Sequence, residues 1–311
     1  MEPAPFRQLA GDADAPARAF WTRAEDGIRL RLALWQTPQS GRGTILLFPG
    51  RTEYAEKYAS VARVLNEAGY AVLIIDWRGQ GLSQRLLDDP FPGHIADFAD
   101  YQRDVVEMVV AGTELGLPRP WHLLAHSMGG AIGLAALHSG LPVQYATFSS
   151  PMWGINLGIL PRWLVQAATR LSAHLGRDGR IAPQRGGNRS YVLDDSFNAN
   201  LLTHDVCNWT RLVREAANWP DLTIGGASFG WVGAALRECR RLAQLPPPEL
   251  PALIAAGTQE QIVSLPAITQ MSQHWRQAHL IRIEGARHEL LLETPPIRRQ
   301  FMQEMLDHFA R

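Results

Sequence analysis

The sequence predicts an α/β fold, with a mostly parallel central sheet that is flanked by helices. Short apolar runs alternate with segments of helical periodicity through the first half of the chain and again near its end. The runs are short and continuous, as expected for strands covered on both faces, and the alternation favours right-handed crossovers. Between residue 151 and about residue 245 this alternation stops, which predicts a helical insertion.

Composition sets the limits of this prediction. The chain has 311 residues, of which 46% are hydrophobic and 19% charged, so its length suits one large domain or one domain with an insertion. The formal net charge is zero, which argues against nucleic acid as a partner, since phosphate binding requires a basic surplus. Neither a signal peptide nor an apolar run of ~18 residues is expected from the sequence. Cys207 and Cys239 form no disulfide framework, which fits a reducing compartment. We therefore expect a cytoplasmic protein, which leaves peripheral contact with the inner face of a membrane open.

Turn and cap residues mark the elements of the first half. Two alternating segments around Asp26-Gly27, a standard tight-turn pair, predict a hairpin over residues 20–37. Gly69 and Gly116 end stretches of helical periodicity, where glycine is a common C-cap. The elements predicted after the hairpin are, in order, strand 44–48, helix 54–68, strand 71–75, helix 97–115, strand 121–124, helix 131–138 and strand 144–148.

The insertion begins at Pro151 and ends at about residue 245, before the run Pro246-Pro-Pro248. It is helix-like, is broken by loops rich in glycine and arginine, and contains five of the ten tryptophans. The elements predicted after it are strand 251–256, helix 265–276, strand 279–283 and a terminal helix from about 296. We therefore expect two parts of one core, residues 1–150 and 246–311, and a helical cap, residues 151–245, inserted after the sixth strand.

The most informative motif is a strand that runs into Ala125-His126-Ser127-Met128-Gly129 and is followed at once by a helical stretch. This is the pattern of a nucleophile elbow, in which the residues two before and two after the serine must be small because the strand and the helix nearly touch at the turn. Ala125 and Gly129 meet that demand. Ser127 is therefore the candidate nucleophile, although a serine that merely caps a helix would also fit the motif alone. His126 is rejected as its base, because adjacent residues at a tight turn point apart.

Two further strand ends supply the partners that a nucleophilic serine needs. Glu260 follows the strand at 251–256, and His288 follows the last strand, so the chain order is serine, acid, histidine. A serine hydroxyl needs a base to take its proton, and an imidazole needs a carboxylate to fix its tautomer. We predict His288 as the base and Glu260 as the acid. Glu284 and Glu289 are alternative acids, but they lie very close to His288 in the sequence.

Acyl transfer at Ser127 also requires two backbone N–H donors for the developing oxyanion. One donor is predicted to be Met128, which directly follows the nucleophile. The other is predicted in the loop after the 44–48 strand, where Gly50 permits an unusual backbone angle and Arg51 offers its amide. No cofactor and no metal ion are predicted.

Several motifs together indicate a family. They are Phe48-Pro-Gly-Arg-Thr-Glu-Tyr54 with Lys57-Tyr58, Ile74-Ile-Asp-Trp-Arg-Gly-Gln-Gly81, Leu124-Ala-His-Ser-Met-Gly-Gly-Ala131, Leu202-Thr-His204 and Gly285-Ala-Arg-His-Glu289. With these motifs the chain resembles the α/β-hydrolases, in particular the monoglyceride-lipase-like serine hydrolases, and among them bacterial lysophospholipases of the L-two type. The resemblance extends from about residue 20 to the end of the chain. More usual members have His-Gly where Pro49-Gly50 stands, and aspartate where Glu260 stands.

The resemblance implies that residues 151–245 form a cap over Ser127. Its tryptophans would then line an apolar tunnel or a rim that faces a membrane, with ordinary aromatic packing as the alternative. The candidate substrate-binding residues are Trp153, Trp163, Trp209 and Trp231. A basic stretch in the same segment could meet a phosphate group; it consists of Arg177, Arg180, Arg185 and Arg189.

The leading expectation is a carboxylic-ester hydrolase that acts on a single-chain lipid, first of all a lysophospholipid, through an acyl-enzyme at Ser127. A monoacylglycerol lipase or general carboxylesterase would use the same site. An aminopeptidase would need cap carboxylates for the substrate ammonium, for which Asp194, Asp195 or Asp205 could serve. Dehalogenases and epoxide hydrolases are disfavoured because they have an aspartate in place of the serine. A non-catalytic interaction protein is disfavoured because no triad position is lost.

Overall fold

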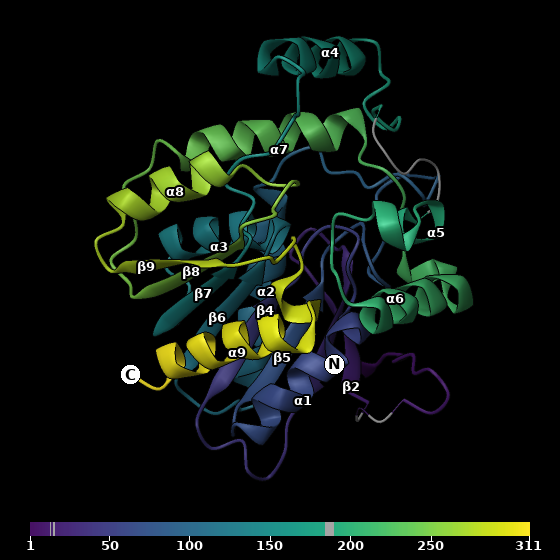
Figure 1. Cartoon of the computed structure of the whole chain (residues 1–311). Coiled ribbons are helices and arrows are strands. Elements are labelled where there is room, and N and C mark those ends of the chain that lie inside the picture. Colours follow the sequence, from purple (N-terminus) through teal and green to yellow (C-terminus); the bar gives the residue numbers. More distant parts are fainter. Residues whose placement is uncertain (13, 15, 184–189) are drawn as a thin grey trace.

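The computed structural model describes residues 1–12, 14, 16–183 and 190–311. Its centre is a twisted nine-stranded sheet with the order β1-β2-β3-β5-β4-β6-β7-β8-β9 (Figure 1). The pairs β1–β2, β2–β3 and β3–β5 are antiparallel, and all the others are parallel. The strands are β1 (Glu2–Pro3), β2 (Arg18–Arg23), β3 (Arg29–Trp35), β4 (Thr44–Phe48), β5 (Ala71–Asp76), β6 (Trp121–His126), β7 (Tyr145–Ser149), β8 (Ala252–Gly257) and β9 (Ala278–Ile283).

Helices cover both faces of the sheet, and each face has its own apolar core. On one face the core includes buried residues of α2, α3 and α8, and on the other face buried residues of α1 and α9. The helices of these two layers are α1 (Ala59–Glu67), α2 (Asp100–Glu114), α3 (Met128–His138), α8 (Leu265–His274) and α9 (Pro295–Phe309). The predicted fold class, a mostly parallel sheet flanked by helices, is confirmed.

The structure differs from the sequence prediction at several element ends. The helix predicted over 54–68 begins as a short 3-10 turn, Ala55–Tyr58, before α1. The helix α3 begins at Met128 and not at 131, so it starts directly after Ser127. The alternating pattern expected in the second hairpin strand is absent, because both faces of β3 are covered from Leu30 onwards: Leu30, Leu32 and Leu34 belong to one core, and Ala33 and Trp35 to the other.

Between β7 and β8 the described chain forms helices that lie beyond the carboxyl ends of the parallel strands (Figure 1). They are α4 (Arg162–His174), α5 (Tyr191–Asp194), α6 (Val206–Asn218) and α7 (Phe229–Leu242), with short 3-10 turns at Phe197–Ala199 and Pro220–Leu222. The helix α4 lies outermost, above α7 (Figure 1). Arg185 and Arg189 of the predicted basic stretch lie outside the described residues. The domain limits 1–150, 151–245 and 246–311 stay a prediction.

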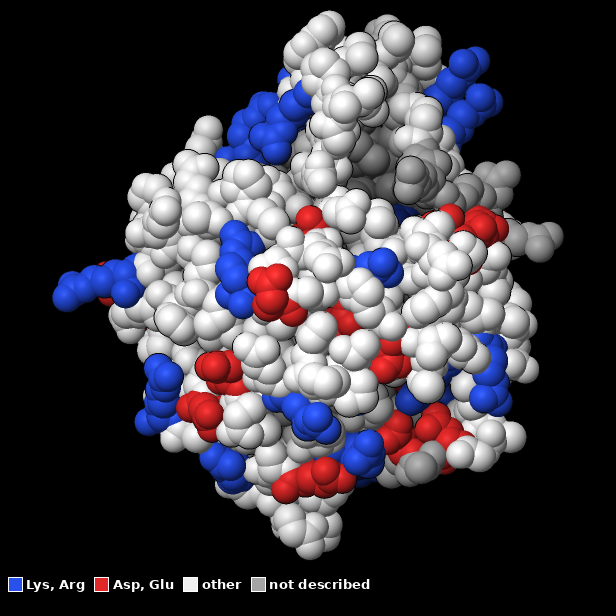
Figure 2. Space-filling model, viewed as in Figure 1, with Lys and Arg blue, Asp and Glu red and all other residues white. Residues whose placement is uncertain are grey.

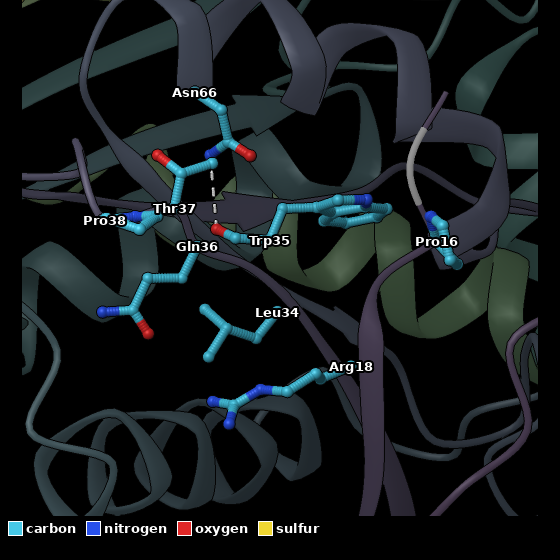
Figure 3. A pocket seen from close by; sticks show the side chains of 8 residues that line it. All are labelled: Pro16, Arg18, Leu34, Trp35, Gln36, Thr37, Pro38 and Asn66. Atoms are coloured by element: carbon cyan, nitrogen blue, oxygen red, sulfur yellow. Dashed lines mark hydrogen bonds between the residues drawn. The ribbon is translucent and has the colours of Figure 1, made fainter. Parts of the chain in front are cut away.

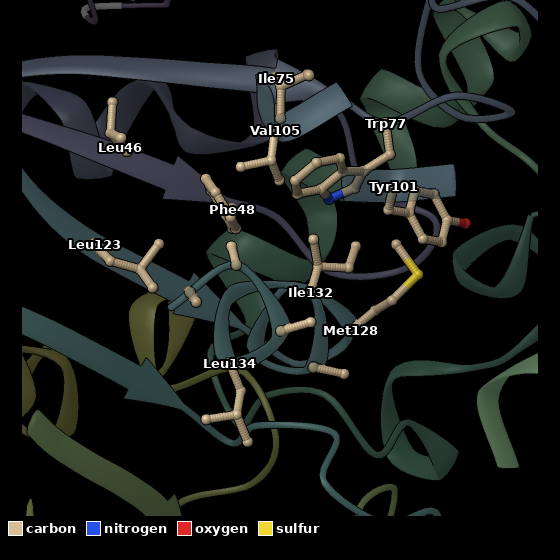
Figure 4. Close-up of a cluster of buried hydrophobic side chains, with 14 of the residues drawn as sticks. Leu46, Phe48, Ile75, Trp77, Tyr101, Val105, Leu123, Met128, Ile132 and Leu134 are labelled. Atoms are coloured by element: carbon tan, nitrogen blue, oxygen red, sulfur yellow. The ribbon is translucent and has the colours of Figure 1, made fainter. Parts of the chain in front are cut away.

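A cluster of aromatic and apolar side chains anchors the two loops on which the candidate site is built (Figure 4). Phe48, the last residue of β4, packs edge-on against Trp77, with 5.1 Å between ring centroids. The Trp77 indole N–H donates to the carbonyl of Pro49 at 2.9 Å. Met128 is fully buried in the same cluster. The loop after β4 and the start of α3 are therefore held by the core and not by solvent-exposed contacts.

Candidate active site

Ser127 stands at a strained turn between β6 and α3. Its φ is 51° and its ψ is −118°, a conformation that non-glycine residues rarely adopt. A Cβ at Gly129 would lie 2.1 Å from the carbonyl oxygen of Phe48, so that position requires glycine. The need for small residues at the elbow therefore has a different source from the one expected. The close neighbour of Gly129 is the backbone at the end of β4, not that of its own strand.

The side chains of Ser127, Glu260 and His288 meet beyond the carboxyl ends of β6, β8 and β9. The Oγ of Ser127 lies 2.8 Å from Nε2 of His288, and Nδ1 of His288 lies 2.7 Å from Oε2 of Glu260. If Nδ1 carries the proton and donates it to the carboxylate, Nε2 is free to accept from the serine hydroxyl. All three residues are buried. The arrangement is that of a serine nucleophile with an oriented base.

Glu260 is held as a carboxylate. Its Oε1 accepts hydrogen bonds from the amides of Ile262 at 2.6 Å and Val263 at 3.1 Å, while its Oε2 faces His288. Burial by itself raises the pKa of this group, but the imidazole of His288 and the two amides outweigh it and lower the pKa to about 2. Glu260 can therefore stabilise a positive charge on His288 without taking up its proton. Glu284, an alternative acid, is exposed to solvent.

The loop after β4 approaches the nucleophile closely. A Cβ at Gly50 would lie 3.1 Å from the Cβ of Ser127, and the Gly50 amide donates to the carboxylate of Glu53. Two residues further on, the Thr52 amide donates to the Gln80 side chain at 2.6 Å, and the φ of Thr52 is 65°. Among the described residues, the Arg51 amide between them donates to no protein acceptor. The loop therefore leaves the Arg51 N–H free, as an oxyanion donor must be.

Behind the elbow, a buried cluster brings together two carboxylates, a lysine and a histidine. The ammonium of Lys57 contacts Glu53 and lies 2.7 Å from Oε1 of Glu289. Nε2 of His126 lies 3.4 Å from Oε2 of Glu289, and its Nδ1 lies 3.1 Å from the carbonyl of Ser149. Burial opposes charge on all of these groups. Even so, the two carboxylates raise the pKa values of Lys57 and His126, and Lys57 with His126 holds the pKa of Glu289 well below its usual range.

Three residues of the same cluster are of types that can bind a metal ion. Ligand atoms of Glu53, His126 and Glu289 lie within 4.8 Å of one another. However, Lys57 already contacts both carboxylates and supplies the positive charge that a cation would bring. The cluster is therefore accounted for by an ion pair.

The four tryptophans predicted to bind substrate occupy different environments. Trp153 is 3% exposed, donates its indole N–H to the carbonyl of Gly130 at 3.0 Å, and packs in the core beside Phe148. Its place in the core favours ordinary aromatic packing over an apolar tunnel, and its role in substrate binding stays a prediction. Trp163 is 70% exposed on α4. Trp209 and Trp231 are buried in the cap helices α6 and α7, where a role in substrate binding stays a prediction.

The roles of Glu53, Lys57 and Glu289 were missed in the sequence. All of them fall inside the motifs that carry the family resemblance, but those motifs assign them no function. Their role follows from contacts across 232 positions of sequence, between Lys57 and Glu289, which no local pattern reveals.

A pocket that is separate from the site at Ser127 lies at the opposite end of the strands (Figure 3). Trp35, which contributes to its wall, pairs with Val72 at the start of β5, whereas Ser127 follows the end of β6. Arg18 is the one ionisable residue among those that line it. This pocket holds none of the three residues expected to perform the chemistry.

Comparisons with known proteins agree with this geometry. Residues 39–295 match the family model described as serine aminopeptidase, S33. The chain is 31% identical to lysophospholipase L2 of Escherichia coli strain K12, over 95% of this chain and 90% of that protein. It is 30% identical to a probable lysophospholipase L2 of Haemophilus influenzae, over 89% and 86%.

Among solved structures, a soluble variant of monoglyceride lipase from Saccharomyces cerevisiae is similar in fold. Its TM-score is 0.74 at 18% identity, and 98% of each chain is covered. A monoacylglycerol lipase of Paleococcus ferrophilus gives a TM-score of 0.67 at 21% identity, over 90% of this chain and 98% of that one. The family model and the two bacterial relatives show more than a shared fold: the chain belongs to the serine aminopeptidase S33 family of α/β-hydrolases, with the lysophospholipase- and monoglyceride-lipase-like enzymes.

Proposed function

We propose that the protein is a serine hydrolase that cleaves carboxylic esters of single-chain lipids, with Ser127 as nucleophile, His288 as base and Glu260 as orienting acid. The observation that carries this proposal is the continuous chain of short contacts from Ser127 through His288 to Glu260. The strained backbone of Ser127 supports it, because strain at a turn persists where function requires it.

The mechanism follows from the positions of these groups. His288 takes the proton of the Ser127 hydroxyl as its oxygen attacks the acyl carbonyl, and Glu260 stabilises the resulting imidazolium. The carbonyl oxygen becomes an oxyanion, to which the amides of Arg51 and Met128 donate. His288 then gives the proton to the leaving alcohol, which produces an acyl-enzyme. Water, activated by the same histidine, releases the fatty acid.

The substrate class is supported by the relatives. The two lysophospholipases, which are at least 30% identical over most of both chains, are named for single-chain phospholipids. Monoacylglycerols and simple esters are the alternative substrates of the same site. An aminopeptidase is less well supported, because Asp205 is engaged as the cap of α6, accepting from the Asn208 amide at 2.7 Å, and Asp194 is exposed.

The acyl chain gives a direct test of the lipid proposal. An apolar site should gain roughly 0.8 kcal/mol for each buried methylene, or about fourfold in kcat/KM per methylene, until it is full. We therefore expect kcat/KM on p-nitrophenyl esters to rise from acetyl to medium chains and then to level off. Equal rates with acetyl and decanoyl esters would favour a general esterase or a peptidase instead.

The helix α4 supports a further proposal about the membrane. Among the described residues, no helix is long and apolar enough to span a bilayer. However, α4 and the turn before it expose large apolar side chains, and the polar Thr169 and Ser172 are buried instead. The exposed residues are Ile159, Leu160, Trp163, Leu164 and Leu171. We propose that this outermost surface, seen at the top of Figure 1 and mostly white at the top of Figure 2, contacts the lipid in which the substrate resides.

Vesicle binding tests this second proposal. Replacing Ile159 and Trp163 together by serine should reduce co-sedimentation with phospholipid vesicles and slow hydrolysis of vesicle-embedded substrate more than that of a dissolved short ester. The matched control is Val106→Ser, since Val106 is an exposed apolar residue of α2, outside the cap. Equal vesicle binding by all three proteins would show that α4 is not a lipid contact.

A further inference from the structure

Among the described residues, the most deeply buried cations each contact two carboxylates, as burial of charge requires. These are Arg31 with Glu56 and Asp76, Lys57 with Glu53 and Glu289, and Arg78 with Asp26 and Asp104. Arg51 departs from this rule. No carboxylate lies within ion-pair distance of its guanidinium in the described part of the chain. Yet burial is deep enough to lower the pKa of Arg51 to about 10.

The surroundings of Arg51 show where its side chain lies. One terminal nitrogen donates to the carbonyl of Gly225 at 2.6 Å, and the guanidinium carbon lies 5.2 Å from the centre of the Trp231 ring. A Cβ at Gly93 would lie 2.8 Å from the same nitrogen, so the guanidinium packs directly on that backbone. Nε has no acceptor among the described residues. Despite this depth, Arg51 as a residue keeps some accessible surface. The guanidinium lies between the loop after β4, which carries it, and the cap, to which Gly225 and Trp231 belong.

The loop that carries Arg51 adjoins the reacting centre. Gly50, the neighbour of Arg51, approaches the Cβ of Ser127 so closely that a side chain there would nearly touch it. One arginine side chain therefore separates the backbone beside the nucleophile from the Arg51 guanidinium. In a lysophospholipid, the glycerol backbone separates the scissile ester from the phosphate by a similarly short stretch of covalent bonds.

We infer that the Arg51 guanidinium binds the phosphate of a phosphate-bearing single-chain lipid and so selects lysophospholipids over neutral monoacylglycerols. This inference rests on the proposed function. Within the described part of the chain, the Nε–H of this guanidinium has no acceptor, and arginine recognises phosphate through parallel charge-assisted hydrogen bonds. A phosphate would supply the counter-charge that the protein gives to Arg31, Lys57 and Arg78 but not to Arg51.

A matched substrate pair tests the inference. Wild type and variants are assayed with 1-lauroylglycerol and 1-lauroylglycerol 3-phosphate, both as monomers, and the ratio of kcat/KM for the phosphate to that for the neutral ester is compared. Wild type should prefer the phosphate. Arg51→Met should lower the ratio about tenfold or more, as expected for lost hydrogen bonds to a charged group, and Arg51→Lys should give an intermediate value.

Arg85→Met is the matched control. Arg85 also binds cap carbonyls without a carboxylate contact, donating to Asp221 at 2.8 Å and Thr223 at 3.2 Å. If Arg51 merely ties the cap to the core, or binds the fatty acid product, Arg51→Met lowers both substrates equally and leaves the ratio unchanged, as Arg85→Met should. That result would overturn the inference.

Two further arms keep the test decisive. If Arg51→Met does not fold, binding of lauryl phosphate and of lauryl alcohol to the Ser127→Ala protein is measured by calorimetry, and equal affinities would overturn the inference. Wild type that hydrolyses neither lauroyl ester would contradict the proposed function itself. Wild type that hydrolyses both equally would contradict the role of Arg51 alone.

Discussion

Two histidine–glutamate pairs lie side by side in this protein, and they do different things. His288 pairs with Glu260 and reaches Ser127, whereas His126 faces Glu289 and does not. The two imidazole rings are only 4.9 Å apart between centroids. His288 and Glu289 are even neighbours in the sequence, yet their side chains belong to different pairs.

The difference lies in what surrounds each pair. Glu260 is bound by two backbone amides and by His288, so a proton that His288 takes from Ser127 adds a charge that Glu260 can balance. In the second pair, Lys57 already lies against the carboxylate, so Glu289 is neutralised before any reaction begins. Identical residue types thus form a reactive pair where the acid lacks a permanent cation, and a structural pair where it has one.

The largest expected effect is on kcat, and it follows from removing the nucleophile or its base. Ser127→Ala and His288→Ala should each reduce kcat by several orders of magnitude, and together by little more, because the residues act as a unit. Rates on a p-nitrophenyl ester measure this. A fluorophosphonate label should attach to Ser127, and mass spectrometry that maps it to another serine would remove the proposed nucleophile.

The two acids give a matched comparison. Glu260→Gln should lower kcat by ~10²–10⁴ and leave folding intact, because it spoils the tautomer of His288 and not its position. Glu289→Gln should act mainly on stability, because it leaves Lys57 with half of its buried counter-charge. Kinetics and urea unfolding on both variants measure this contrast. If Glu289→Gln instead costs the larger part of kcat, the assignment of the acid is reversed.

Lys57 tests whether the second pair is structural. Lys57→Met removes the cation between Glu53 and Glu289 and should lower the free energy of unfolding by about 3–5 kcal/mol. Urea unfolding at neutral pH measures it. Arg63→Met serves as control, because Arg63 contacts carboxylates but is about half exposed, and its loss should cost less than about 1 kcal/mol. Similar losses in the two variants would show that the cluster is not a stabilising core.

The sequence was sufficient for the parts of the fold and site that follow local rules. Alternation of apolar runs and helices predicted the sheet, and strand ends predicted Ser127, Glu260 and His288, which the structure brings together. The motif around Ser127 could be interpreted because a nucleophile elbow requires small residues at fixed spacing, although the backbone that Gly129 approaches is that of β4 and not that of its own strand.

The remainder depends on contacts between distant segments, which composition and spacing do not encode. Trp153 is of a residue type that often lines binding sites, but it lies in the core, because its indole donates to the Gly130 carbonyl and packs against Phe148. Arg31 is buried at a position where the alternating pattern predicts an exposed side chain. It can be buried because Glu56 and Asp76, which are distant in the sequence, neutralise its charge. Side chains of this kind are placed by tertiary partners and not by their own neighbourhood.

The smallest expected effect is on the pH dependence of the free energy of unfolding, which should have opposite signs for the two pairs. The pKa of Glu260 is lowered to about 2, so its contribution to stability is present above its ordinary value near 4.5 and is lost as the pH falls towards 2. Relative to Glu260→Gln, wild type should therefore lose about 1 kcal/mol between pH 7 and pH 4 on account of this carboxyl.

The pKa of His126 is raised above 6.5, so its contribution is present below that value and is lost as the pH rises through the raised pKa. Relative to His126→Asn, wild type should lose stability on the alkaline side instead. Urea unfolding of the three proteins at pH 4, 5, 7 and 9 measures both differences. Differences that do not change with pH would mean that neither pair gains its stability from the charges assigned to it.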